Sequence, residues 1–270
     1  MKPKQSLDQA HGLRALLGIN ANRRLLCCFG SLLATQKNAL LINLAYAITK
    51  LNKSVHLIDV NQQHNGISHK SRSAIAPLLF NFSSAAQPSH IAAYDNGILI
   101  SKLTDIAISQ ISKDPIKTNK ITSAIEAVLE DCDLACLDLQ LDEDSDFLIG
   151  NMSLSKMLLI TNPTADAIKS TYLQLKQLSV LHPHCQFSLI IMDGSQSQAE
   201  QAYANLQHTA QQFLNLEMTL LGILPHDPYF LSAVQAGKTV IDTFPNSTST
   251  IALINMAKHL IADIFATSNR

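Results

Sequence analysis

The chain has 270 residues, and its 20 lysines and arginines almost balance its 21 aspartates and glutamates. The resulting formal net charge of −1 gives no global argument for nucleic-acid binding. With 47% hydrophobic and 15% charged residues the chain can bury a large core, and only nine glycines and nine prolines exclude a collagen-like or disordered polymer. We expect a soluble globular protein whose length fits a single α/β domain.

The sequence also predicts the compartment and the absence of a metal site. The five cysteines are odd in number, lie mostly in apolar stretches and lack zinc spacing, which favours buried, reduced thiols. Residues 1–9 contain Lys2, Lys4 and Asp8 but no apolar run of the kind that a secretory leader carries. No uncharged apolar stretch approaches the roughly 18 residues that cross a bilayer. We therefore expect a cytoplasmic protein that binds no metal.

In chain order, the first predicted element is a short helix over Ser6–Leu17, which starts with the capping-box spacing Ser6-x-x-Gln9. Short apolar runs then predict buried strands at Leu25–Phe29, Val55–Val60, Gly97–Ile100, Leu134–Leu139, Met157–Ile160, Phe187–Met192 and Met218–Leu224. Helical patterns lie between or after them, at Asn38–Lys50, Lys120–Glu130, Ala165–Leu181, Gln198–Phe213 and Ile251–Phe265. The segment Asn61–Tyr94 shows no strong period and is predicted to be loop and helix.

Strands that alternate with helices are typical of an α/β fold with a doubly wound, mostly parallel sheet flanked by helices. Ligands of such sheets lie beyond the carboxyl ends of the strands. Asp59 and Asp138 follow apolar strands at these ends, and two carboxylates there suit a magnesium-nucleotide site. The alternative is that each carboxylate only caps the following helix or loop.

Several segments, in order from Leu7 to Leu260, resemble the MinD/ParA class of deviant Walker-A ATPases and fit its FlhG/FleN subgroup best. They are Asp8-Gln-Ala-His-Gly-Leu-Arg14, Asn43-Leu-Ala45, Val55–Asp59, Asp133–Asp138, Thr161-Asn-Pro163 and Leu221–Pro228. The resemblance implies a P-loop fold, an ATP-closed dimer that touches the inner membrane, and control of the number and placement of flagella. It also implies an N-terminal partner-binding helix at 1–22 and a single MinD-like domain at 23–270.

The nucleotide loop departs from the family pattern. The family reads KGGxGK[ST] after the first strand, and spacing places this loop on Leu32-Leu-Ala-Thr-Gln-Lys37-Asn38, where only the last lysine remains. P-loop glycines let backbone N–H groups approach the phosphates, whereas Leu33, Ala34 and Gln36 carry a Cβ atom at these positions. Leu32 replaces the lysine that reaches across the dimer, and Asn38 replaces the hydroxyl that binds magnesium.

Other family positions are only partly kept. Asp59 matches the first acidic position of the DxD motif, Asn61 replaces the second, and Asp138 matches the Walker-B aspartate. Asp193 replaces an asparagine near the adenine, while Pro225 and Asp227 keep the loop beside the base. We interpret Lys37, Asp59, Asn61 and Asp138 as relics of catalysis. We expect no cofactor; ATP and magnesium would bind only through the implied contacts Lys37, Asn38, Asp138, Asp193, Pro225 and Asp227.

The resemblance leaves several functions open. We favour a regulator of flagella that has lost ATPase activity and binds an FlhF-type GTPase, or another flagellar protein, through Asp8, Gln9, Leu13 and Arg14. The alternatives are a working ATP-dependent switch, or a related scaffold that serves cellulose secretion or partition. The apolar face of Ile251–Phe265 either packs in the core, which we favour, or makes a weak peripheral contact with the inner membrane.

Overall fold

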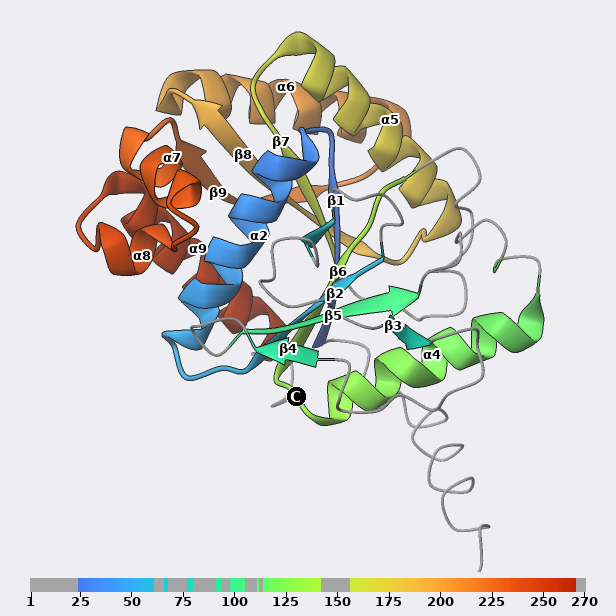
Figure 1. Cartoon of the computed structure of the whole chain (residues 1–270). Coiled ribbons are helices and arrows are strands. Elements are labelled where there is room, and N and C mark those ends of the chain that lie inside the picture. Colours follow the sequence, from blue (N-terminus) through green and yellow to red (C-terminus); the bar gives the residue numbers. More distant parts are fainter. Residues whose placement is uncertain are drawn as a thin grey trace, which may run out of the picture.

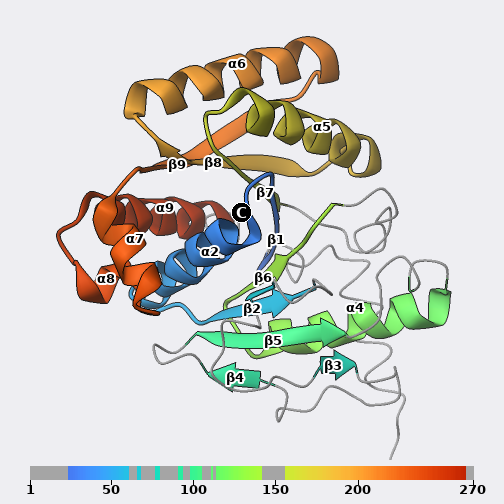
Figure 2. The same ribbon diagram turned by 45° about the horizontal axis from the view of Figure 1, so that its top comes forward.

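The structure, a computed structural model, describes residues 24–60, 66–67, 77–79, 91–93, 98–104, 111, 114–141 and 156–265. These residues form an α/β fold in which a twisted sheet lies between two layers of helices (Figures 1 and 2). The predicted fold class is therefore confirmed.

The sheet has nine strands in the order β3-β5-β2-β6-β1-β7-β8-β9, with β4 paired to β5 outside this path. All pairs are parallel except β4 with β5. The strands are β1 (Leu25–Gly30), β2 (Val55–Asp59), β3 (Pro77–Leu79), β4 (Ile91–Ala93), β5 (Leu99–Thr104), β6 (Leu134–Asp138), β7 (Lys156–Thr161), β8 (Gln186–Gly194) and β9 (Met218–Pro225). The central position of β1 places its carboxyl end in the middle of one sheet edge.

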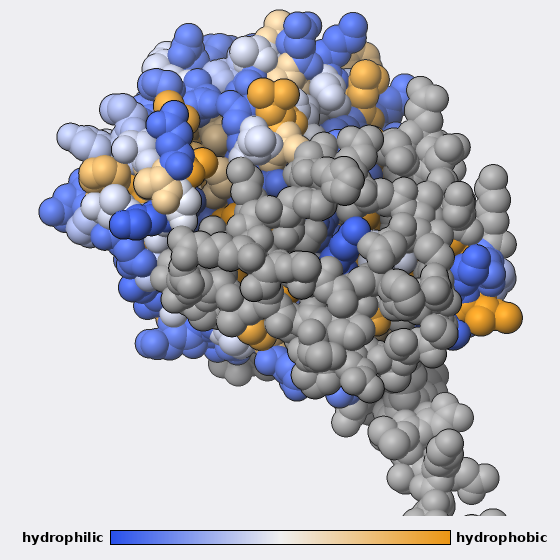
Figure 3. Space-filling model, viewed as in Figure 1, coloured by the Kyte–Doolittle hydropathy of each residue, from blue (hydrophilic) through white to orange (hydrophobic). Residues whose placement is uncertain are grey.

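The helices divide into two layers according to the face of the sheet that they cover (Figure 2). One layer contains α4 (Pro115–Glu130), α5 (Ala165–Leu181) and α6 (Gln196–Leu214). The other contains α2 (Ala34–Thr49), α7 (Pro228–Gln235), α8 (Val240–Thr243) and α9 (Thr248–Phe265). On the face drawn in Figure 3, the described surface is mostly hydrophilic and its apolar side chains occur in small groups.

The apolar side chains of strand β1 pack against both layers of helices. Its side chains alternate between the faces, so that Leu25, Cys27 and Phe29 pack with α4, α5 and α6, while Leu26 and Cys28 pack with α2 and α9. All five are at most 2% exposed. A strand covered on both faces needs an apolar residue at every position, which is why the parallel strands are continuous hydrophobic runs in the sequence.

Local capping explains where several helices begin. Asp114 accepts hydrogen bonds from the N–H groups of Ile116 and Lys117 at 3.0 and 3.3 Å, and Pro115 occupies the first helical position. Helix α4 therefore begins five residues before the predicted Lys120. Helix α6 begins at a capping box formed by Ser195 and Gln198, two residues before its predicted start.

The prediction of mostly loop and helix for Asn61–Tyr94 was wrong at residues 77–79 and 91–93, where the structure has the strands β3 and β4. Each of these strands has only three residues and depends on pairing with β5, so neither leaves a period in the sequence. Pro77 is tolerated because it is the first residue of an edge strand. The predicted helix Ser6–Leu17 lies outside the described residues.

The predicted core role of the last helix is confirmed. Leu253, Ala257, Leu260 and Ile264 of α9 are buried against α2 and the sheet, whereas Ile251 is 55% exposed. No helix in the described part of the chain is long and apolar enough to span a bilayer.

His56 is a titratable group inside this core. It lies on β2, is 1% exposed, and its Nε2 atom is 3.0 Å from the Ser101 hydroxyl on the neighbouring strand β5. Burial lowers the pKa of His56 from 6.5 to about 4, although the negative charge of Asp131 acts in the opposite direction. The folded protein therefore holds His56 neutral at pH values where the unfolded chain protonates it.

We predict that stability falls as the pH is lowered through this window. Between about pH 6.5 and 4 the unfolded state binds more protons at His56 than the folded state, so the free energy of unfolding should drop by up to about 3 kcal/mol. Urea unfolding at a series of pH values measures this loss. The variant His56→Gln should lack this component, while the exposed control His184→Gln should keep it; equal slopes for the wild type and His56→Gln would contradict the prediction.

Candidate functional site

The candidate site lies at the carboxyl end of β1, where the chain turns into α2. Ser31 follows β1, and its N–H donates to the Ile160 carbonyl at 3.1 Å. Its hydroxyl is within hydrogen-bond distance of the hydroxyls of Thr161, at 3.1 Å, and Thr171, at 2.9 Å. The turn is thereby fixed to β7 and α5.

The segment at the position of a nucleotide loop is the first turn of a helix. Helix α2 begins at Ala34, three residues before Lys37, and the N–H groups of Gln36 and Lys37 donate to the Leu33 carbonyl at 2.9 and 3.1 Å. No residue from 30 to 38 has a positive φ. A phosphate cradle requires several N–H groups that converge on one point, usually through left-handed residues, and this turn has committed two of them to the helix. These residues therefore do not fit a triphosphate held in the manner of a P-loop.

Lys37 is buried and forms an ion pair. It is 4% exposed, its Nζ atom is 2.5 Å from Oδ1 of Asp138, and it donates a hydrogen bond to the Leu139 carbonyl at 2.8 Å. Its aliphatic part lies against Gly30, since a Cβ atom at that glycine would come within 2.9 Å of Lys37 Cδ. The ammonium is thus held at the end of β6 by groups of the protein itself.

The two strand-end carboxylates are neighbours. Asp59 on β2 and Asp138 on β6 are register partners, and both are at most 1% exposed. Burial raises the pKa of Asp138, the positive charge of Lys37 opposes that shift, and the charge of Asp59 adds to it. The Asp59 carboxylate lies against Gly66, where a Cβ atom would overlap it. Lys37, Asp59 and Asp138 therefore form one buried electrostatic cluster.

Asp193 organises a second cluster, between α2 and the tips of β8 and β9. It has a left-handed backbone with φ of 64°, at a register shift between the two strands. Gln36 donates from Nε2 to Asp193 Oδ2 at 3.0 Å, and His226 Nδ1 lies 3.1 Å from Oδ1. Gln36 occupies a glycine position of the family pattern, so the substitution that adds a Cβ to the loop also adds a side chain that connects α2 to β8. No local pattern in the sequence indicates these roles of Gln36 and His226.

Asp227 acts as a helix cap. It accepts hydrogen bonds from the N–H of Tyr229 at 2.9 Å, and from the hydroxyl of Thr248 and the N–H of Ser249, both at 3.0 Å. Burial alone would raise the pKa of Asp227, but the hydrogen bonds from Ser249, Tyr229 and Thr248 outweigh it and lower the pKa. Asp227 thus joins the start of α7 to the start of α9.

The structure separates the residues that the sequence proposed for nucleotide contacts. Lys37, Asp59 and Asp138 lie together, and Pro225 pairs with Gly194 beside Asp193. Asn38 is buried within α2, and Asp227 is occupied with helix capping. The relic Asn61 and the partner-binding residues Asp8, Gln9, Leu13 and Arg14 lie outside the described residues.

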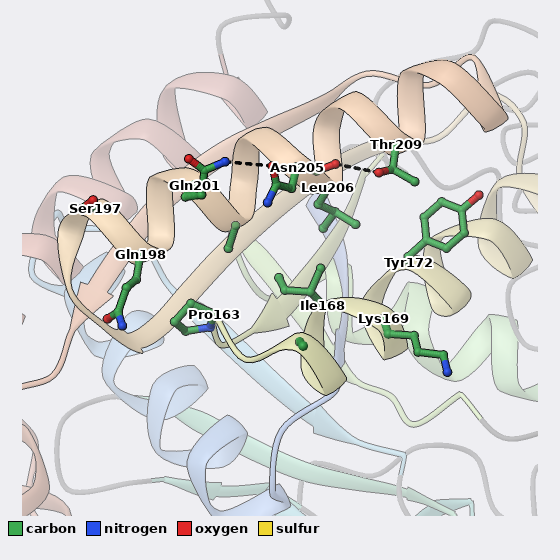
Figure 4. A pocket seen from close by; sticks show the side chains of 12 residues that line it. Pro163, Ile168, Lys169, Tyr172, Ser197, Gln198, Gln201, Asn205, Leu206 and Thr209 are labelled. Carbon is green, nitrogen blue, oxygen red and sulfur yellow. Dashed lines mark hydrogen bonds between the residues drawn. The ribbon is translucent and has the colours of Figure 1, made fainter.

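A groove of about 760 Å³ separates the outer surfaces of α5 and α6 (Figure 4). Its floor includes Ile168 and Leu206, and polar side chains of α6 form one rim. On that rim Gln201 donates to the side chain of Asn205 at 2.9 Å, and the Thr209 hydroxyl donates to the Asn205 carbonyl at 2.8 Å. These polar groups bond to one another, and the groove presents no arrangement typical of catalysis.

Comparison with known proteins supports the MinD/ParA resemblance. No model of a known protein family matches the chain. A 151-residue segment is 20% identical to the antiactivator FleN of Pseudomonas aeruginosa and covers 56% of this chain and about half, 54%, of that protein. The MinD cell division protein of Aquifex aeolicus superimposes with a TM-score of 0.66 at 16% identity, over 88% of this chain and 97% of that one. A ParA family ATPase from Chlorobium tepidum gives 0.65 at 12% identity, over 88% and 99%.

The chain therefore has the fold of the MinD/ParA ATPases. The sequence match to FleN is consistent with the FlhG/FleN subgroup that the N-terminal motif indicated.

We predict that Lys37 now supports the fold. Lys37→Ala should lower the free energy of unfolding by about 3 kcal/mol or more, because Asp138 would remain buried without its cation. The double variant Lys37→Met with Asp138→Leu removes both charges and should be clearly more stable than Lys37→Ala. Urea denaturation compares them, with Lys169→Ala on the surface of α5 as the control. A loss below about 1 kcal/mol for Lys37→Ala would contradict a structural role.

Proposed function

We propose that this protein is a MinD-like regulator that acts by binding other proteins and has lost ATP turnover. One observation carries the proposal: the segment that would cradle phosphates is a helical turn whose side chains are engaged within the protein. Gln36 bonds to Asp193, and Lys37 bonds to Asp138 and to the Leu139 carbonyl.

The energetics support this proposal. For ATP to bind as in a P-loop, α2 would have to unwind its first turn, and Lys37 would have to leave a buried carboxylate with a raised pKa. Breaking one side of a buried ion pair typically costs about 3 to 5 kcal/mol. Asn38 and Leu32 stand where the family has a magnesium ligand and a lysine for the partner subunit, so new contacts would offset little of this cost.

We further propose that the regulated process is flagellar assembly. The proposal is supported by the Asp8–Arg14 motif and by the match to FleN, an antiactivator, over about half of that protein. Residues 1–22 would form the partner-binding helix, residues 23–270 would form the scaffold, and the partner would be an FlhF-type GTPase in the cytoplasm.

The first prediction concerns ATP. Titration calorimetry with Mg-ATP should give a dissociation constant no tighter than about 1 mM, near −4 kcal/mol, and ATP hydrolysis should not exceed background. Light scattering should give the same mass with and without Mg-ATP, because no nucleotide bridges two subunits. Micromolar binding, or turnover that Lys37→Ala abolishes, would instead support an ATP-dependent switch.

The second prediction concerns the partner. A peptide of residues 1–20 should stimulate GTP hydrolysis by the FlhF-type GTPase of the same organism, and Arg14→Ala should remove most of this stimulation, because a guanidinium can form charge-assisted hydrogen bonds near the nucleotide. The full chain carrying Arg14→Ala should unfold at the same urea concentration as the wild type. The flagellar assignment fails if neither the peptide nor the full chain changes the rate of GTP hydrolysis.

A further inference from the structure

The groove of about 760 Å³ between α5 and α6 is elongated, and both of its walls are helices (Figure 4). On α6 its lining runs from Ser197 to Thr209, which corresponds to about 18 Å of helix. Ile168 of α5 and Leu206 of α6 form part of an apolar floor, and the amide side chains of α6 form a polar rim. An apolar floor inside a polar rim is typical of protein–protein interfaces.

The groove has a positive electrostatic character. Among the lining residues that the structure describes, Lys169 is the only charged one, and it is exposed. The first turns of α5 and α6 line the same end of the groove, so the positive ends of two helix dipoles add to this charge. The carboxylates of these helices, Asp166 and Glu200, lie outside the lining, and Glu200 accepts a hydrogen bond from Gln196 at 2.7 Å. An acidic occupant therefore complements this groove.

The helical walls determine which backbone form fits between them. The main-chain N–H and C=O groups of α5 and α6 bond within each helix, so neither wall offers the open ladder that an extended strand requires. An occupant can make contact only with side chains, as happens when the ridges of one helix pack into the grooves of another. A helix of about 12 residues matches the length of the α6 wall.

We propose that this groove binds an acidic amphipathic helix of another protein, whose apolar face covers Ile168 and Leu206 and whose carboxylates face Lys169. A helix of this length is marginally stable in water, so the partner segment would fold as it docks. A second copy of this chain does not complement the groove, because a two-fold contact through it would bring two positive surfaces together.

The groove would add a second partner site to the proposed regulator, and in this respect the inference rests on the proposed function. The groove lies between α5 and α6, whereas the proposed GTPase site lies in residues 1–22. One scaffold could therefore hold two different proteins at the same time.

Two matched synthetic peptides of about 14 residues test the proposal on the full-length protein. Both carry leucines at i, i+3, i+4 and i+7, and they differ only in the residues that flank this face, which are glutamates in one peptide and lysines in the other. Fluorescence anisotropy at about 0.1 M salt should show that the acidic peptide binds at least about tenfold more tightly than the basic peptide. Equal affinities, or tighter binding of the basic peptide, would overturn the proposal.

Matched variants locate the binding. Lys169→Glu should weaken binding of the acidic peptide at least about tenfold and strengthen binding of the basic one, whereas Lys258→Glu, at an exposed position of α9 in the other helix layer, should change neither. Asn205→Trp should fill the groove and block the acidic peptide, while Ala204→Trp, at an exposed position of α6 outside the lining, should not. Unchanged midpoints of urea unfolding establish that the variants are folded.

Three results would show that the groove has a different role. An acidic peptide that binds Lys169→Glu or Asn205→Trp as tightly as the wild type binds elsewhere on the protein. A lack of saturable binding up to about 1 mM peptide excludes docking of the proposed strength. A dimer in light scattering that Asn205→Trp converts to a monomer assigns the groove to a second copy. Each result overturns the proposal, and because neither ATP nor a GTPase takes part, failure here is distinguishable from failure of the proposed function.

Discussion

The ion pair between Lys37 and Asp138 is the interaction on which the arrangement at the carboxyl edge of the sheet depends. It connects α2 to β6 across the end of β1, and both partners are almost fully buried. A charge that is buried in this way loses its hydration. Only a close opposite charge and good hydrogen bonds offset the free energy that this loss costs. Lys37 has both, through Asp138 and the Leu139 carbonyl. Lys37 therefore neutralises the buried Asp138 carboxylate whether or not a phosphate approaches it.

The ion pair with Asp138 also explains why a lysine can stand at position 37 although the neighbouring residues are not the glycines of a P-loop. A glycine-rich loop is conformationally costly, and it is retained only where a ligand requires its unusual backbone. Here the segment has the backbone of an ordinary helical turn, and Gln36 uses its side chain to tie that turn to Asp193. The residue that stands at a glycine position of the P-loop pattern is thus the same residue that makes the contact with Asp193.

The main elements could be predicted from the sequence because each depends on local patterns. Buried parallel strands such as Leu134–Asp138 are continuous apolar runs, and long helices such as α5 have a strong period. Strands β3 and β4 could not be predicted, because they are defined by their pairing with β5. At the site, the meeting of Asp59 and Asp138 followed from parallel topology. The contacts of Gln36 and His226 with Asp193 did not, since they join positions more than 30 residues apart.

The short strands β3 and β4 have a further consequence for association between molecules. They run in opposite directions along successive parts of the outer edge of β5, and Pro77 contributes no N–H. An incoming strand would meet two brief ladders of opposite polarity, so it could not extend the sheet continuously. This arrangement protects one margin of a large sheet from edge-to-edge aggregation, a hazard that long, flat, exposed strands carry.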